Sequence, residues 1–198
     1  MRAVDIKNGT GPATALYLNP STPVPSPAAG QALVKVRAFG LNRMDLIQRE
    51  GHYPLPPQAP STLGVEFSGV IVSLSSEGDH GSFKAGDEVF GLAYGGAYAE
   101  YIAVSSKMLL HKPAHLSFEQ TAGIPETWIT ATQALHFVLG GVEGGKSILW
   151  HAGASGVSIA GIQLSRLAGA GEGVCDSGHG GEVPVCGARA GGDEGVQL

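Results

Sequence analysis

The first half of the chain is a series of short segments in which apolar and polar residues alternate. Such alternation over a few residues, bounded by Gly and Pro, is typical of half-buried β-strands. The segments are Met1–Ile6, Leu16–Leu18, Gln31–Phe39, Leu63–Val72, the stretch that follows the Gly86-Asp87 turn as far as Phe90, and Ala97–Val104. Because several short strands joined by glycine turns build sandwiches or barrels, the first 110 or so residues predict a compact β-barrel.

Helical spacing of apolar residues replaces the alternation further along. Before that, one short helix is expected between Gly40 and Gly51. Ser117 and Gln120 have the spacing of a capping box, which predicts a helix start, and the stretch 126–138 predicts a second helix. The pattern therefore changes from mainly strand-like alternation to helical spacing near residue 115.

The next patterned stretch is an apolar run, Ser147–His151, followed by Gly153, Gly156 and the helical pattern Val157–Leu167. Strand, glycine turn and helix open a dinucleotide-binding unit, since the glycines let the backbone approach a pyrophosphate and the helix N–H groups face its charge. The full G-x-G-x-x-G pattern is absent, so a tight turn without a ligand is the alternative. No strand-like pattern follows at Glu172 or Asp176, where an acidic residue for the adenine ribose is expected.

Composition narrows the classes of protein that fit. Hydrophobic residues make up 43% of the 198, charged residues 15%, and the net charge of −5 has no basic cluster beside it, which argues against nucleic acid as a partner. No apolar run is long enough to span a membrane and no signal peptide is apparent, so a cytoplasmic protein is expected. Both cysteines, Cys175 and Cys186, lie in the last thirty residues.

Several motifs, taken in order, resemble the medium-chain dehydrogenase/reductase superfamily and its zinc-free quinone oxidoreductase (zeta-crystallin-like) branch. They are ALVKVRAFGLNRMDLIQREGHYPLPP, LGVEFSGVIV, FKAGDEVFGLAYGGAYAEYIAV, IPETWITATQALH and ILWHAGASGVSIAGIQLSRLAGA. The likeness covers about residues 1–170 and is greatest to the p53-inducible quinone oxidoreductase group.

The resemblance implies an α+β protein of two domains. A GroES-like β-barrel that carries most substrate contacts would occupy residues 1–115, and the start of an incomplete NAD(P)-binding Rossmann (α/β) domain would occupy residues 116–170. Members of the family pass a hydride from NADPH to a quinone or enone in a cleft between the domains, and most form homo-oligomers.

Residue by residue, the resemblance carries over the following site. Asn42 and Tyr53 match positions that line the nicotinamide and substrate cleft, and Thr130 matches a threonine that contacts the nicotinamide. Cofactor-binding positions in the glycine turn are Gly153, Ala154, Ser155, Gly156 and Val157. The alternatives are a helix N-cap for Asn42, a loop aromatic packed on prolines for Tyr53 and an ordinary helix hydroxyl for Thr130. Asp45 and Glu66 are interpreted as structural carboxylates.

No metal is expected. Zinc-dependent relatives hold their catalytic zinc with a Cys near the position of Asn42 and with the His of a Gly-His-Glu at the position of Gly64-Val65-Glu66. Since zinc sites in proteins are built from Cys, His and carboxylate ligands, Asn42 and Val65 do not supply one. Cys175, His179 and Cys186 have no standard zinc spacing.

The resemblance stops after Ala170. A third of the residues from Gly169 onward are glycine, and the segment 171–198 is expected to be a disordered, non-homologous tail. A one-base frameshift would account for it, because a back-translation from Glu172 can be shifted into a sequence similar to the family's next strand and helix.

The predicted function is therefore that of an NADPH-dependent quinone oxidoreductase-like protein, truncated at its C-terminus and impaired as it stands. The alternatives are a 2-alkenal or enoyl reductase of the same family, and a non-catalytic GroES-like fragment that acts as a binding module. The expected partner is a small quinone or enone, with neither nucleic acid nor membrane.

Overall fold

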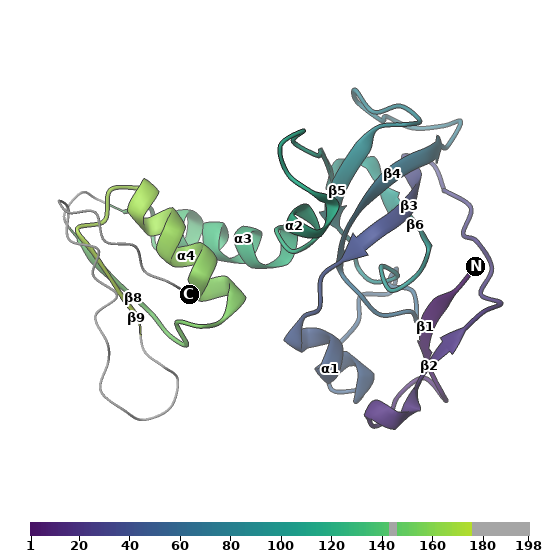
Figure 1. Ribbon diagram of the computed structural model, residues 1–198, viewed down its shortest axis with the longest axis horizontal. Coiled ribbons are helices and arrows are strands. Elements are labelled where there is room, and N and C mark those ends of the chain that lie inside the picture. Colours follow the sequence, from purple (N-terminus) through teal and green to yellow (C-terminus); the bar gives the residue numbers. More distant parts are fainter. Residues whose placement is uncertain (143–145, 176–198) are drawn as a thin grey trace. The chain divides into compact units, whose positions relative to one another are not determined.

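A computed structural model describes residues 1–142 and 146–175 (Figure 1). It divides into two units, one from Met1 to Glu126 and one from Thr127 onward, which are described separately. The predicted domain limits of 1–115, 116–170 and 171–198 stay predictions. The part of the predicted tail from 176 to 198 lies outside the described residues.

The first unit is built on an antiparallel sheet of five strands in the order β6-β3-β4-β5-β7. Figure 1 shows β3, β4 and β5 next to one another. The strands are β3 (Gln31–Phe39), β4 (Glu66–Leu74), β5 (Glu88–Leu92), β6 (Tyr101–Ser105) and β7 (Leu109–His111). The predicted strand Gln31–Phe39 is confirmed, with the same first and last residues. Alternate side chains of a strand point to the same face, and Ala32 and Val34 lie in the core.

A separate hairpin, β1 (Ala3–Ile6) and β2 (Leu16–Asn19), confirms the first two predicted strands, and the short helix η1 (Ala13–Ala15) lies between them. The hairpin is joined to the sheet through the segment before β6. The Val4 N–H donates to the Tyr98 carbonyl at 2.8 Å, and the Val36 N–H donates to the Glu100 carbonyl at 2.9 Å. That segment, predicted as the start of a strand at Ala97, enters the ladder only at Tyr101.

The core of this unit lies on the sheet. Its buried members come from all five strands and the loop before β6: Ala32, Val34, Phe67, Ile71, Val89, Ala93, Ala97, Ile102, Val104 and Leu109. Strand β7, three residues long, follows the helix η2 (Ser106–Met108) and was not predicted, since three residues carry too little alternation to recognise.

Two short helices of the first unit begin at predicted caps. Helix α1 (Arg43–Arg49) starts after Asn42 and is followed by Gly51 with φ +81°, the left-handed conformation that glycine adopts easily. Helix α2 (Phe118–Ala122) starts with the predicted Ser117–Gln120 capping box. Helix α3 (Pro125–Thr132) follows and continues as the π-helix η3 (Gln133–Val138), so the predicted helix over 126–138 is present with a change of winding.

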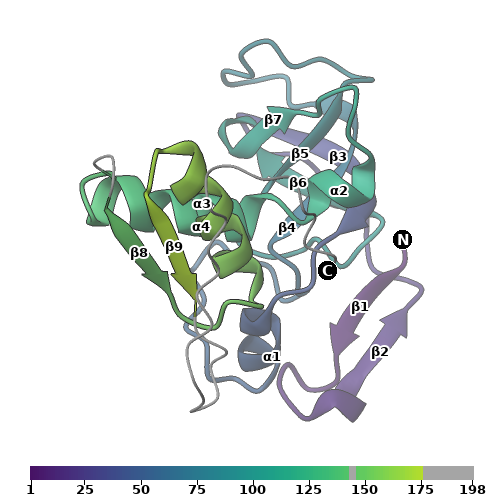
Figure 2. The same cartoon turned by 60° about the vertical axis from the view of Figure 1, so that its left-hand side comes forward.

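In the second unit, β8 (Ser147–Trp150) is followed by α4 (Gly156–Leu167) and then by β9 (Glu172–Cys175). Strands β8 and β9 are parallel, with Ser147 opposite Glu172 and Trp150 opposite Cys175 (Figure 2). The predicted strand and helix are confirmed. Strand β9, by contrast, lies where no strand was predicted and where the disordered tail was expected to begin. Because the ladder forms through backbone hydrogen bonds, a strand can pair there without an alternating pattern of apolar side chains.

Candidate functional site

The glycine turn between β8 and α4 carries five of the predicted site residues. Ala152 has φ +54°, which turns the chain sharply after the strand. Ser155 is the N-cap of α4, and its Oγ accepts the Ser158 N–H at 3.3 Å. The Ser158 hydroxyl donates to the His151 carbonyl at 2.5 Å. The two serine side chains therefore link the end of β8 to the first turn of α4.

Glycine is required where α4 packs on its neighbours. A Cβ on Gly161 would lie 2.4 Å from the indole ring of Trp150, and the Trp150 Nε1 donates to the Ser165 Oγ at 2.9 Å. A Cβ on Gly156 would lie 2.9 Å from the Thr127 Cγ2. The helix therefore sits close to β8 and begins next to α3.

This turn fits a pyrophosphate. Ala154, Ser155 and Gly156 are exposed, Gly153 and Val157 are half-buried, and the N–H groups in the first turn of a helix have no acceptors within it. A 12-residue helix places its positive end at this turn. Residues that would hold the adenine ribose follow the second strand of such a unit, and after Cys175 the chain lies outside the described residues.

Asn42, the predicted nicotinamide or substrate residue, has a structural role as well. It is the N-cap of α1 and forms a capping box with Asp45, whose Oδ2 accepts the Asn42 N–H at 2.8 Å. Its side-chain Nδ2 donates to the Glu66 Oε1 at 2.8 Å. The alternative interpretation as an N-cap is confirmed, and it does not exclude a second contact of the same amide.

Glu66 is the charged centre of this cluster. It is 2% exposed, and its Oε2 accepts the N–H of Glu126 at 2.9 Å. Burial raises the pKa of Glu66, the hydrogen bonds from the Glu126 N–H and the Asn42 amide lower it, and the neighbouring Asp45 charge raises it. From the sequence, Glu66 is interpreted as structural. The feature that could have indicated a polar cluster around it is the presence of a carboxylate inside the apolar strand LGVEFSGVIV.

Two further members of the cluster are a tyrosine and an acid. The Tyr98 hydroxyl, which sequence reasoning missed, donates to the Asp45 Oδ2 at 2.7 Å, and both residues are buried. Burial, together with this hydrogen bond and the charge of Asp45, raises the pKa of Tyr98 far above its usual value. Glu126 also has a raised pKa, through burial and the charges of Glu66 and Asp45.

The structure does not bring Asn42 and Tyr53 into one hollow. Tyr53, 39% exposed, lines a hollow of about 280 Å³ with Val65, Tyr94 and Glu126. Asn42 lines another of about 340 Å³ with Asp45, Arg49 and Tyr98, among others. Thr130 is exposed on α3 in the second unit.

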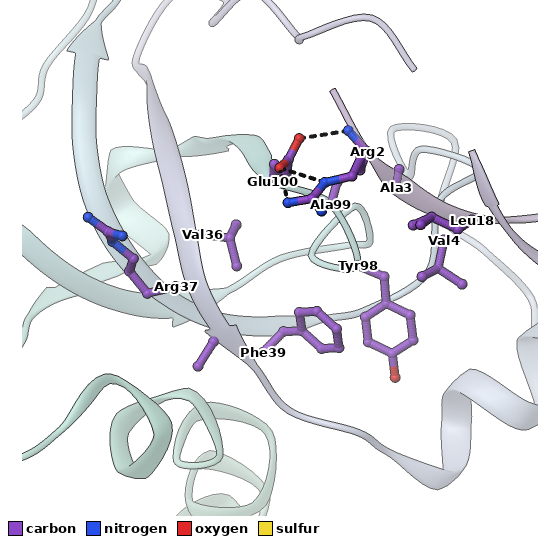
Figure 3. A pocket seen from close by; sticks show the side chains of 11 residues that line it. Arg2, Ala3, Val4, Leu18, Val36, Arg37, Phe39, Tyr98, Ala99 and Glu100 are labelled. Carbon is purple, nitrogen blue, oxygen red and sulfur yellow. Dashed lines mark hydrogen bonds and ion pairs between the residues drawn. The ribbon is translucent and has the colours of Figure 1, made fainter. Parts of the chain in front are cut away.

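A third hollow, of about 500 Å³, lies between the β1–β2 hairpin and β3 (Figure 3). The Phe39 and Tyr98 rings, 4.6 Å apart, form its apolar floor, and Arg2 forms an ion pair with Glu100 at 2.7 Å on its rim. None of the predicted site residues lines it.

Over residues 1–142 and 146–175, no three His, Cys, Asp or Glu side chains gather so that they could hold a metal ion. The position of Asn42 is tied to Glu66 and Asp45, and Val65 lines the hollow of Tyr53. Nor does any described helix combine the length and apolar character needed to cross a membrane.

Comparison with known proteins places this geometry in a family. Residues 28–114 match the family model of the alcohol dehydrogenase GroES-like domain. The chain is 37% identical over 172 residues to the quinone oxidoreductase of Homo sapiens, covering 85% of this chain and 50% of that protein. It is 40% identical over 151 residues to the synaptic vesicle membrane protein VAT-1 homolog of Mus musculus, covering 76% of this chain and 36% of that one.

The comparisons support a likeness of this chain to the medium-chain dehydrogenase/reductase superfamily, in its quinone oxidoreductase and VAT-1 branch. The solved quinone oxidoreductase of Coxiella burnetii superposes with a TM-score of 0.78 at 35% identity, over 89% of this chain and 56% of that one. Members with solved structures include the CurK enoyl reductase, 27% identical, and a mycobacterial protein complexed with NADPH, also 27% identical. This chain spans about half the length of the relatives that it matches, or less.

Proposed function

We propose that this sequence is that of an NADPH-dependent quinone oxidoreductase-like protein of the p53-inducible group, which reduces a quinone or enone by hydride transfer without a metal ion. The observation that carries the proposal is Asn42. At the position near which zinc-dependent relatives supply a Cys ligand, this chain has an amide that donates to a buried carboxylate, in the residue that is the N-cap of α1. Such a group orients a ligand and does not bind zinc.

The residues of the chain would divide the work as follows. NADPH, when bound, supplies the hydride. The N–H groups of Gly156 and Val157 face the pyrophosphate, Thr130 contacts the nicotinamide, and Asn42 orients either the carboxamide or the substrate carbonyl. Tyr53 donates its O–H to the substrate oxygen from the rim of a hollow whose lining is mostly apolar, which suits a flat quinone.

The 198 residues by themselves are proposed to bind NADPH weakly and to be impaired as an enzyme. Support comes from the second unit, in which two described parallel strands pair only with each other, since parallel sheets normally have both faces covered. Exposed apolar side chains there include Phe137, Val138 and Leu167. The same observation favours the second candidate, a GroES-like binding module without catalysis.

The enoyl or 2-alkenal reductase activity is the other candidate, favoured by the similarity to the CurK enoyl reductase. A quinone needs little acid assistance, because its reduced form is aromatic, whereas an enone gains more from the Tyr53 hydroxyl. Substrate class therefore separates the two activities.

The test is a titration of purified residues 1–198 with NADPH, followed by loss of reduced-nicotinamide absorbance with a benzoquinone, a naphthoquinone and a 2-alkenal. Weak binding and slow quinone reduction are expected, and Tyr53→Phe should lower kcat/KM about tenfold, as expected for one lost hydrogen bond. Tyr17→Phe is the matched control, because Tyr17 is equally exposed at 39% and lies in β2. Rates typical of an enzyme would contradict the impairment, and no reduction at any NADPH concentration would favour the binding module.

The frameshift hypothesis has its own test, the nucleotide sequence of gene and transcript across the codons for Ala168 to Gly173. One inserted or deleted base that restores the family pattern would support it. An intact frame would contradict it and favour the binding module.

A further inference from the structure

Glu66 is buried among apolar neighbours in β4, yet it carries a carboxyl group. Its flanking residues Val65 and Phe67 are both buried, and Phe67 belongs to the core. A buried carboxylate is costly unless hydrogen-bond donors satisfy it. Here two donors do so, one on each oxygen: the Asn42 Nδ2 at 2.8 Å on Oε1 and the Glu126 N–H at 2.9 Å on Oε2.

The backbone around Glu66 makes room for this carboxylate. Gly40 follows β3, and its N–H donates to the Glu66 carbonyl at 3.2 Å. A Cβ on Gly40 would lie 2.0 Å from the Glu66 Oε1, so any other residue at position 40 would displace the carboxylate from Asn42. The glycine and the acid therefore belong to one arrangement.

The groups that face Glu66 add charge of the same sign. Asp45 on α1 and Glu126 on α3 both act on it electrostatically, and the Tyr98 hydroxyl is already donated to Asp45. Burial and the charges of the two neighbouring acids, Asp45 and Glu126, disfavour the ionised form of Glu66. An apolar side chain of the same size would avoid this cost, but it would leave the Asn42 Nδ2 and the Glu126 N–H without their acceptor.

We propose that Glu66 is a positioning residue, which holds the Asn42 amide in one orientation and fixes the first turn of α3 by the same carboxylate. The inference rests on the proposed function in so far as Asn42 contacts the nicotinamide or the substrate. The Asp45 N–H donates to the main-chain carbonyl of Asn42 at 3.1 Å, and the Asn42 side chain gives one Nδ2 hydrogen to Glu66. The other Nδ2 hydrogen is the group that meets a ligand. Asn42 therefore acts as a donor, and the ligand group that it takes is a carbonyl oxygen.

The first test needs no cofactor and uses the full 198-residue chain. In NMR spectra, one Asn42 Nδ2 proton should exchange slowly with water, and its chemical shift should follow the ionisation of Glu66 as the pH is varied. In Glu66→Gln that titration should disappear, and the Glu126 amide should exchange about tenfold faster, as for a lost hydrogen bond to a charged group.

Two controls accompany this measurement. Glu77→Gln removes an exposed acid and should leave the Asn42 signal unchanged. The Asn19 amide, which donates to the Asp5 Oδ2 at 2.9 Å, should not respond to Glu66→Gln. An Asn42 amide that does not titrate in the unaltered chain overturns the proposal, and this result is obtained even if Glu66→Gln fails to fold.

The second test separates positioning from stability. Glu66→Gln should weaken NADPH binding about tenfold. The pair Asn42→Asp with Glu66→Gln reverses donor and acceptor, since the new Gln donates to the new Asp. It should restore the Tm but not the binding, because Asp has no N–H to offer. If the pair restores both, Glu66 is only structural and the proposal is wrong. If the unaltered chain neither binds NADPH nor reduces a quinone, the proposed function fails, while the amide titration still decides the role of Glu66.

Discussion

The two units of this chain bury their apolar residues to very different extents. In the first, five antiparallel strands enclose a contiguous core that includes Val34, Phe67, Ile71 and Val89, each at most 1% exposed. In the second, the buried hydrophobic side chains among the described residues are Ala131, Leu135 and Ala160. The exposed large hydrophobic side chains are more numerous: Ile129, Phe137, Val138, Leu139, Leu149, Ile159 and Leu167.

The difference follows from how the two kinds of sheet are built. Antiparallel strands join through short turns, so neighbours along the chain pair and close a core locally. Parallel strands need a crossover each, and their sheet is stable only when helices cover both faces. The first unit has a contiguous core of buried residues from all five strands. The second has one parallel pair with α4 against it, which makes the glycine turn the part of the proposed site with the least support.

The largest expected effect comes from the core of the first unit. Phe67→Ala should cost about 3–5 kcal/mol, because Phe67 is fully buried and leaves a cavity. Phe137→Ala, at an 80% exposed site of the second unit, should cost less than about 0.5 kcal/mol. Denaturation followed by circular dichroism for the sheet, and by fluorescence of Trp128 and Trp150 for the second unit, measures both. Equal losses would contradict the contrast between the units.

Within the first unit, Tyr98→Phe should cost about 1–3 kcal/mol, since it leaves the buried Asp45 with one donor fewer. Tyr94→Phe is the matched control at a 51% exposed tyrosine four residues earlier, and it should change the free energy of unfolding by less than about 0.5 kcal/mol. A Tyr98→Phe protein as stable as this control would mean that the hydroxyl is not needed to satisfy Asp45.

In the second unit, Gly161→Ala should cost about 1–3 kcal/mol by overpacking, because the new Cβ meets the rigid Trp150 ring. The gain in helix propensity of about 1 kcal/mol offsets part of this loss. Gly123→Ala is the control, since a Cβ there has no atom within 4 Å and φ is not positive. The loss should appear in the tryptophan fluorescence transition, and an unchanged transition would show that α4 does not pack closely on β8.

The smallest effect is a difference in pH dependence between two acids, each at the second position of its helix. Glu126 has a pKa raised by burial, so its contribution to stability is present below the pKa of the unfolded chain and is lost as pH rises through the folded pKa. Glu126→Gln should therefore gain stability over the unaltered chain between acid and neutral pH. Glu119, exposed, has a pKa lowered by its backbone hydrogen bond and by Ser117, so its contribution is lost as pH falls. Glu119→Gln should lose stability toward neutral pH, and slopes of the same sign would contradict the assignment.

Much of the fold could be predicted because it depends on local patterns. Alternation located Gln31–Phe39, the Ser117 and Gln120 pair located a helix start, and the two glycines located the turn before α4. Strand β9 could not be predicted, because its residues show no alternating pattern and it forms by backbone pairing with β8. For the site, the resemblance indicated Asn42, whereas the role of Glu66 was missed, since its partners lie 24 and 60 positions away in the sequence.

The sequence by itself determined the order of the elements, their caps and the turns, because these depend on residues within a few positions of each other. Only the tertiary structure decided which buried polar groups meet. The carboxylate of Glu66 between the Asn42 amide and the Glu126 N–H, and the Tyr98 hydroxyl on Asp45, join segments far apart in the chain. A buried polar group needs a hydrogen-bond partner, and tertiary packing decides which residue supplies it. Hydrophobic periodicity indicates local secondary structure and does not identify such a partner.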